Sequence, residues 1–160
     1  MKKNSALVPM YIKEIQNLGG APFYYKEGTN TRSWVHIEDL MRLYLHVIEA
    51  AASDSRECFN DNGYYFAGTQ EHSQMDVARA TGAILARNGI IESKEPKEVG
   101  LEELDSMVNI PGFPRLARYL FASNSRTRAK RAEGLFGYKG EAPGLLETLE
   151  ADILDTVKGA

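Results

Sequence analysis

The 160-residue chain is long enough for one domain with a real core and too short for two comfortable ones. Hydrophobic residues make up 43% of it and charged residues 26%, as in ordinary soluble domains. A net charge of -3 gives no reason to expect a nucleic-acid partner, because such proteins usually carry a basic excess. The single cysteine, Cys58, excludes an internal disulfide, and with three histidines it offers no metal-ligand spacing.

The hydropathy pattern gives no membrane segment. No apolar run approaches the roughly 18 residues that span a bilayer. The start of the chain, "MKKNSALVPMYIKE", lacks the uninterrupted apolar stretch of a signal peptide. We therefore expect a cytoplasmic protein with no membrane partner.

The first predicted elements are a helix and two short strands. The helix has apolar residues at helical spacing and stops at Gly19-Gly20: Val8, Tyr11, Ile12, Ile15 and Leu18. The sequences "PFYYK" (22–26) and "SWVHI" (33–37) then predict two strands, joined by the turn "EGTN".

A second helix and a third strand follow. Asp39 is predicted to cap this helix. Its apolar stripe comprises Leu40, Leu43, Tyr44, Val47, Ile48 and Ala51. After a polar loop at 53–62, the glycine-bounded "GYYFAG" (63–68) predicts a strand, and Ser73 the N-cap of a third helix that ends at Asn88-Gly89.

The rest of the chain is predicted to be mostly helical. Residues 90–99 are expected to be extended, and helical patterns cover 101–108, 113–120 and 129–136. A last helix runs from near Pro143 to Val157. The result is an α/β chain with too few strands for a proper sheet. Because open strand edges normally pair with something else, the chain is expected to be part of a larger object.

Three segments, in the right order, resemble one protein family. "EGTNTRSWVHIEDL" (27–40), "GYYFAGTQEHSQMDVARATGAIL" (63–85) and "SNSRTRAKRAEGLFGYKGEAPGLLETLEADI" (123–153) are similar to segments of the extended and atypical short-chain dehydrogenases/reductases, the NAD-dependent epimerase/dehydratase family. The resemblance implies a partial NAD(P)-binding Rossmann-like fold, with few short strands and a mostly helical C-terminal substrate-binding region. Residues 1–160 would then be a single domain, and the N-terminal cofactor-binding part would be absent.

The chain departs from this family at the reaction machinery. No Gly-rich turn opens a helix, although a dinucleotide pyrophosphate needs one. None of the eight tyrosines is followed by a lysine four residues later, as the family's proton transfer requires. We therefore predict no catalytic, cofactor-binding or metal-binding residue here. NAD or NADP would serve the complete family enzyme, and this chain alone would bind neither.

Six residues are candidates for substrate binding. The resemblance places Arg32 where family members contact a substrate phosphate, which suits the planar, permanently charged guanidinium. A solvated turn residue paired with Glu27 is the alternative. Trp34 and His36 alternate along the predicted strand and would face one side, either lining a pocket or packing in the core.

Tyr11, Asn4 and Ser5 complete the candidate set. They match the family's region near the nicotinamide site and the closing helix of the substrate cleft. The spacing of Tyr11 from Ile15 suits a core face equally well.

The sequence thus predicts the substrate-binding portion of an NAD(P)-dependent epimerase/dehydratase or reductase, inactive alone. Its ligand would be a small molecule with a hydroxyl or carbonyl group. Two other classes stay open. One is a non-catalytic binding or regulatory module that pairs with a separate Rossmann-domain chain, and the other is an inactive truncated product.

Overall fold

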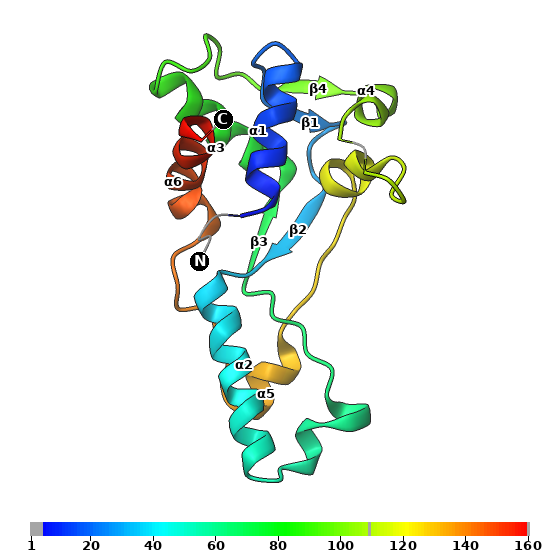
Figure 1. Cartoon of the computed structure of the whole chain (residues 1–160), viewed down its shortest axis with the longest axis vertical. Helices are drawn as coiled ribbons and strands as arrows, with labels where there is room; N and C mark the ends of the chain where they lie inside the picture. Colours follow the sequence, from blue (N-terminus) through cyan, green and yellow to red (C-terminus); the bar gives the residue numbers. More distant parts are fainter. Residues whose placement is uncertain (1–4, 109, 160) are drawn as a thin grey trace. The chain divides into compact units, whose positions relative to one another are not determined.

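The computed structural model describes residues 5–108 and 110–159, without the side chain of Asn60 (Figure 1). It confirms an α/β chain with few short strands. In chain order the elements are α1 (Leu7–Asn17), β1 (Phe23–Tyr25), β2 (Thr31–Trp34), α2 (Ile37–Ala52), the 3-10 turns η1 (Arg56–Cys58) and η2 (Asn60–Asn62), β3 (Gln70–Ser73), α3 (Gln74–Arg87), β4 (Lys97–Val99), α4 (Leu101–Ser106), the π-helical turn η3 (Arg118–Ala122), α5 (Lys130–Phe136) and α6 (Leu145–Lys158).

The strands form two small sheets. β1 pairs with β4 in parallel, with Phe23 opposite Lys97 and Tyr25 opposite Val99. β2 pairs with β3. Sheets of two strands are marginal by themselves and depend on the helices that pack against them.

The chain divides into two compact units made of interleaved segments. Unit 1 contains Met1–Thr31, His72–Asn124 and Leu146–Ala160, and unit 2 contains Arg32–Glu71 and Ser125–Leu145. Neither unit is continuous in sequence, so neither can be cut from the chain at a single point.

Unit 1 has the larger hydrophobic core. Tyr11, Phe23 and Phe121 meet at its centre, with ring centroids 4.7 to 5.6 Å apart in tilted and edge-to-face arrangements. Around them lie buried residues of α1, α3, β4, α4 and α6: Val8, Ile12, Ile15, Ile84, Leu85, Val99, Leu104, Leu149 and Ile153.

Unit 2 has a smaller core. Its fully buried members come from α2, α5 and their flanks: Leu43, Ala129, Ala132 and Tyr138. Partly buried residues that pack against them are Val47, Tyr65, Ala67 and Phe136. The Tyr138 hydroxyl donates a hydrogen bond to the carbonyl oxygen of Ala67 at 3.1 Å.

The main predicted helices are confirmed, and for the third of them so are both predicted end signals. The Ser73 hydroxyl accepts a hydrogen bond from the backbone N–H of Asp76 at 3.1 Å, and the Asp76 carboxylate accepts one from the Ser73 N–H at 3.3 Å. This capping box starts α3, which ends at Asn88 before Gly89 at φ +68°. Of the described residues, no helix is both long enough and apolar enough to cross a membrane.

The predicted strand at 33–37 and its following cap are corrected. β2 ends at Trp34, and His36 is the N-cap residue of α2, so Trp34 and His36 do not alternate along one strand. The His36 Nδ1 atom accepts a hydrogen bond from the Glu38 N–H at 3.2 Å. A ring nitrogen therefore performs the capping predicted for Asp39, which is buried and bonds elsewhere.

The prediction of a strand at residues 63–68 is also wrong, because this segment forms no regular secondary structure. Residues 63–69 are not part of any helix or strand, and β3 begins at Gln70. Within the described ranges, the backbone N–H groups of residues 64–68 donate no hydrogen bond to protein atoms. A strand exists only when a neighbouring strand pairs with it, and none of the strands in the described ranges pairs with this segment.

The pattern over 113–120 is corrected as well. The structure has a π-helical turn at Arg118–Ala122, which begins later in the chain than the predicted helix and is not an α-helix. A short, wide turn of this kind is held by its surroundings rather than by intrinsic helix propensity.

Candidate functional site

Two of the candidate residues, Arg32 and Trp34, lie on β2. They are two positions apart, so their side chains leave the same face of the strand. Beside them, the Ser33 N–H donates to the Ser125 carbonyl oxygen at 2.9 Å. The Ser33 hydroxyl donates to the Thr127 carbonyl oxygen at 3.0 Å and accepts from the Thr127 N–H at 2.7 Å. These bonds fix this part of β2 against segment 125–127.

Arg32 is a half-buried guanidinium. Burial lowers its pKa to about 10, because an apolar environment disfavours the charged form. Arg32 nevertheless stays protonated at neutral pH. An anion that bound to it would replace part of the solvation that the folded chain removes. Its position therefore suits recognition of a phosphate or a carboxylate.

Trp34 places its indole N–H in a buried position. Within residues 5–108 and 110–159, Nε1 has no hydrogen-bond acceptor. Buried indole N–H groups usually find a partner, because an unsatisfied buried donor costs about 1–3 kcal/mol. Arg32 and Trp34 thus present two donor groups from one strand face.

The other candidate residues occupy structural positions. His36 caps α2. The Ser5 hydroxyl accepts a hydrogen bond from the Leu7 N–H at 3.2 Å, at the start of α1. Tyr11 is 4% exposed and lies in the core of unit 1. Asn4 lies outside the described residues.

The Tyr11 hydroxyl is engaged with a single backbone residue. It donates to the Phe23 carbonyl oxygen at 2.7 Å and accepts from the Phe23 N–H at 3.0 Å. Burial raises the pKa of Tyr11, against the lowering effect of its bond to Phe23. The phenol is therefore a neutral core group, as its spacing from Ile15 allowed.

Unit 2 also contains a polar pocket that the sequence did not reveal. Its volume is about 410 Å³, and it is lined by Gly68, Thr69, Gln70, Glu71, Thr127, Arg128, Ala129, Lys130, Glu133, Tyr138, Lys139 and Gly140. None of the six predicted substrate residues lines it. Three cationic and two anionic side chains surround it, and Glu71 is bound to Arg126 at 2.7 Å. The sequence carries no signal for it, because its charges come from segments distant in the chain.

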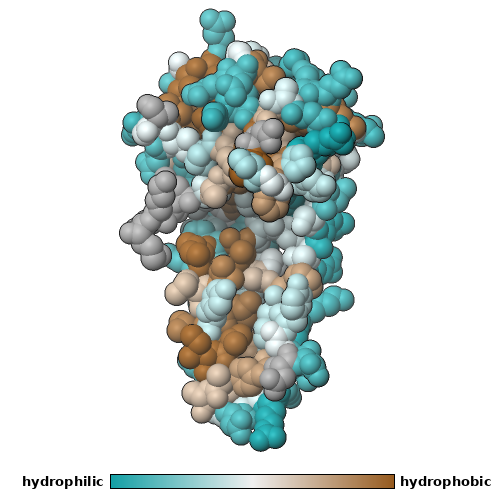
Figure 2. Space-filling model, turned by 45° about the vertical axis from the view of Figure 1, so that its right-hand side comes forward, coloured by the Kyte–Doolittle hydropathy of each residue, from teal (hydrophilic) through white to brown (hydrophobic). Residues whose placement is uncertain are grey.

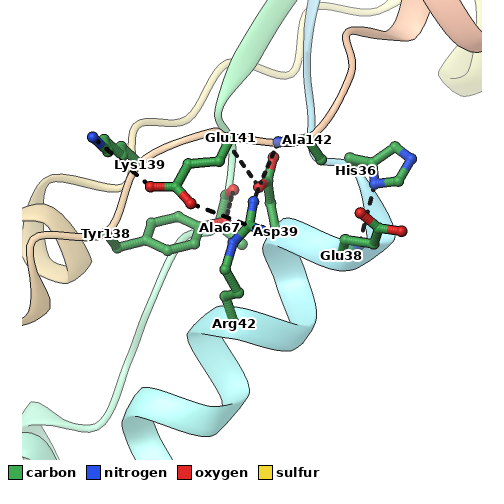
Figure 3. A network of polar contacts seen from close by, with 9 residues as sticks. All are labelled: His36, Glu38, Asp39, Arg42, Ala67, Tyr138, Lys139, Glu141 and Ala142. Atoms are coloured by element: carbon green, nitrogen blue, oxygen red, sulfur yellow. Dashed lines mark hydrogen bonds and ion pairs between the residues drawn. The ribbon is translucent and has the colours of Figure 1, made fainter.

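Asp39 anchors a network that joins α2 to segment 141–142 within unit 2 (Figure 3). Its Oδ1 atom accepts hydrogen bonds from the N–H groups of Glu141 at 3.0 Å and Ala142 at 3.2 Å, and it pairs with Arg42. Burial alone would raise the pKa of Asp39, but these three interactions outweigh it and lower the pKa. Asp39 is thus a structural carboxylate held through Oδ1, whereas its buried Oδ2 atom has no hydrogen-bond partner among the described residues.

The described part of the chain can be compared with the groups that hold a dinucleotide pyrophosphate or a metal ion, and its paired glycines do not fit the pyrophosphate. Gly19 and Gly20 follow α1, at φ +77° and +92°, and the Gly20 N–H donates to the Ile15 carbonyl oxygen at 2.8 Å. They close a helix instead of opening one, so they form no cradle for a pyrophosphate. Among the described residues, no cluster of three or more His, Cys, Asp or Glu side chains could hold a metal ion.

Comparison with known proteins gives one match. Residues 1–60 match the model of the NAD dependent epimerase/dehydratase family. This range contains α1, β1, β2 and α2, and with them Arg32, Trp34 and His36. The match supports a relation between this chain and the family, whose enzymes depend on NAD or NADP. Searches of the curated proteins and of the solved structures found no match.

Proposed function

We propose that the chain is the substrate-binding portion of a cytoplasmic NAD(P)-dependent epimerase/dehydratase or reductase, and that it is inactive alone. Its substrate is a small molecule with a hydroxyl or carbonyl group. The observation that carries this proposal is the family match over residues 1–60, which includes the strand with Arg32. The helical C-terminal part completes the substrate-binding region.

Arg32 and Trp34 are the substrate-contacting residues in this proposal. The Arg32 guanidinium binds an anionic group of the substrate through two parallel hydrogen bonds, which its partial burial strengthens. The Trp34 indole N–H donates to a neighbouring substrate oxygen. The α2 cap at His36 fixes the end of this segment, whereas Tyr11 and Ser5 support α1 and β1. A substrate contact by Asn4 stays a prediction.

The cofactor belongs to the complete enzyme in this proposal. NAD or NADP would exchange a hydride with the substrate there. The residues of this chain do not fit the dinucleotide, since Gly19 and Gly20 end a helix. The chain therefore orients the substrate and supplies no proton-transfer step.

Ligand binding by the isolated chain tests the proposal. A panel of small hydroxy and keto compounds with a phosphate or carboxylate group is screened by thermal shift and then by calorimetry. We expect at least one to bind, and Arg32→Gln to weaken that binding by about tenfold or more. The matched control is Arg87→Gln, which removes a surface arginine paired with Glu150.

Three results would contradict the proposal. The first is binding that Arg32→Gln leaves unchanged, and the second is no binding by any compound of the panel. The third is NAD(P)-dependent turnover of an alcohol or carbonyl compound by the 160-residue chain alone, which would mean that catalytic groups are present after all.

A further inference from the structure

The polar pocket of unit 2 has no role in the proposed function. Its walls come from residues 68–71, from the stretch 127–133 and from residues 138–140, all within one compact unit. Its volume of about 410 Å³ lies in the range that holds small molecules. Neither Arg32 nor Trp34 lines it, so a ligand bound in this pocket would occupy a second site.

The walls of the pocket are fixed against one another at close range. The Ser33 hydroxyl accepts from the Thr127 N–H at 2.7 Å and donates to the Thr127 carbonyl oxygen at 3.0 Å. A Cβ added at Gly68 would lie 2.9 Å from Oγ1 of Thr127, and one at Gly140 would lie 2.9 Å from Cβ of Thr69. Only glycine permits these approaches without movement. The pocket is therefore formed before a ligand binds, which reduces the ordering cost of binding.

Cationic side chains at the pocket lack partners in the folded chain. Arg128 and Lys130 line it, and within the described ranges neither makes a hydrogen bond or an ion pair. Lys139, from another segment, lies 3.8 Å from Glu141 between Nζ and Oε1, and its side chain is 75% exposed (Figure 3). An exposed pair at this distance is weak, so Lys139 can also reach a ligand.

The carboxylates at the pocket do not cancel this positive charge. Glu71 is already bound by Arg126, whose Nη2 and Nε atoms lie 2.7 and 3.0 Å from Oε2. The Arg126 guanidinium holds the pKa of Glu71 below its usual range, and the charge of Arg128 adds to this effect. Glu133 is the other carboxylate in the wall. The wall thus keeps an excess of positive charge and suits an anionic ligand.

A buried hydroxyl is a second, independent sign of a polar ligand. Thr69 lines the pocket, and its Oγ1 atom is buried without a hydrogen-bond partner among the described residues. A buried polar atom of this kind commonly belongs with a water molecule, an ion or another group outside the protein chain. Rotation about the first side-chain torsion of Thr69 turns the hydroxyl toward a new neighbour, so a bound oxyanion can supply the missing acceptor.

The exposed apolar surface of unit 2 lies on other residues. Figure 2 shows hydrophobic side chains gathered over the unit that contains α2. The exposed apolar residues of this helix do not line the pocket: Ile37, Met41, Tyr44, Leu45 and Ile48. The pocket therefore recognises its ligand by charge and hydrogen bonds, not by burial of an apolar group.

We propose that this pocket binds the phosphate group of a small phosphorylated molecule. A phosphate monoester carries a charge of about −1.5 to −2 at neutral pH and presents three acceptor oxygens. Cations from two segments, Arg128 and Lys130 in one and Lys139 in the other, can each reach one of these oxygens. A carboxylate offers two oxygens in one plane and is matched by a single guanidinium fork, so it would use this set of side chains less fully.

The experiment titrates the full 160-residue chain, labelled with nitrogen-15, with inorganic phosphate and with glycerol phosphate. Amide chemical shifts identify the residues that respond, and chloride and acetate at matched ionic strength are the comparison anions. We expect saturable shifts centred on residues 68–71, 127–130 and 138–140, with acetate binding about tenfold more weakly or less. Phosphate should also bind more weakly at about pH 5.5 than at about pH 7.5, because its second pKa is about 6.

Substitutions locate the site. Arg128→Gln and Lys130→Gln should each weaken the binding of both phosphate probes by about fivefold or more, since each removes one charged donor. The matched control is Arg56→Gln, at an 88% exposed arginine of the same unit that lies outside the pocket. Because all three side chains are exposed, melting temperatures close to that of the unmodified chain establish that each variant folds.

Four results would overturn the inference. They are shifts that grow without saturation, saturable shifts centred away from the pocket, phosphate binding that neither substitution weakens, and acetate binding as tight as that of phosphate. Arg32→Gln separates this site from the proposed function. It should leave the response of the pocket unchanged, whereas binding of the proposed substrate depends on it, so either inference can fail while the other stands.

Discussion

At the scale of single residues, Tyr11 shows how a candidate ligand contact becomes part of the core. Its hydroxyl satisfies both backbone groups of Phe23, on the strand that also pairs with β4. The Tyr11 side chain thus completes the hydrogen bonding of β1 where no further strand lies. This role uses the phenol proton and one acceptor position of the oxygen, and Gln74 is a further hydrogen-bond partner of the same hydroxyl, so Tyr11 is engaged on all sides by the core.

Tyr11→Phe is expected to destabilise the fold and leave ligand binding unchanged. It deprives two buried backbone groups of a partner, which should cost about 1–3 kcal/mol in the free energy of unfolding. The raised pKa of Tyr11 adds a pH dependence, because only the unfolded state releases the phenol proton near pH 10. The stability contribution is therefore present below pH 10 and lost above it. Urea unfolding from pH 7 to 11 should show a steeper alkaline loss for the unmodified chain than for Tyr11→Phe.

Asp39 gives the opposite pH dependence. Its lowered pKa means that the folded chain holds the charged form more strongly than the unfolded chain. The resulting stability is present above the ordinary aspartate pKa of about 3.9 and is lost as the pH falls below it. Asp39→Asn should cost about 1–3 kcal/mol at pH 7 and less at pH 3. Denaturant unfolding at both pH values measures this, with Asp54→Asn, an exposed carboxylate, as control. An equal cost at both values would contradict it.

At the scale of elements, two helical glycines test how tightly α3 and α5 are packed. A Cβ at Gly82 of α3 would collide with the carbonyl oxygen of Lys94, whereas a Cβ at Gly134 of α5 meets nothing within 4 Å. Gly82→Ala should therefore lower the free energy of unfolding by about 1–3 kcal/mol, despite the better helix propensity of alanine. Gly134→Ala should raise it by about 0.5–1 kcal/mol. Thermal melts of the two variants should shift in opposite directions, and a stabilising Gly82→Ala would refute the close packing.

Elements were predictable where their signals are local. Ser73 and Asp76 form a capping box within three residues, and Gly89 takes the left-handed conformation that ends α3. The outcome for segment 63–68 was not predictable, because an alternating pattern favours a strand but does not show whether another strand pairs with it, and none in the described chain does. His36 was missed as a cap since a ring nitrogen is an unusual capping acceptor. The place of Asp39 in the first turn predicts a cap, whereas the two backbone N–H groups that bind it lie about a hundred residues away, at Glu141 and Ala142.

The candidate site was predictable only in part, for the same reason. Arg32 and Trp34 could be placed on one strand from their spacing alone. The burial that lowers the pKa of Arg32 and the unpartnered indole N–H of Trp34 depend on tertiary packing, which spacing does not determine. The polar pocket of unit 2 depends on tertiary packing even more. Thr69 and Lys139 both line it, although they are seventy positions apart in the sequence.

At the scale of the whole molecule, the two units differ in how much they bury. Unit 1 buries large side chains from several elements, including Phe23, Phe121 and Leu104. Among the described residues, the buried core cluster of unit 2 consists of one leucine, two alanines and one tyrosine. Hydrophobic burial is the main favourable contribution to folding, so the resistance to local opening should follow this difference.

Hydrogen exchange of the isolated chain should therefore divide along the units. Amides of α1 and α3 in unit 1 should exchange at least about tenfold more slowly than those of α2 in unit 2, although α2 is the longest helix described. Helix length would favour the opposite order, since propagation stabilises long helices. The prediction thus separates tertiary packing from helix propensity. If α2 is protected as strongly as α3 in the isolated chain, unit 2 is stable with its apolar face exposed, and a partner is not needed to hold it together.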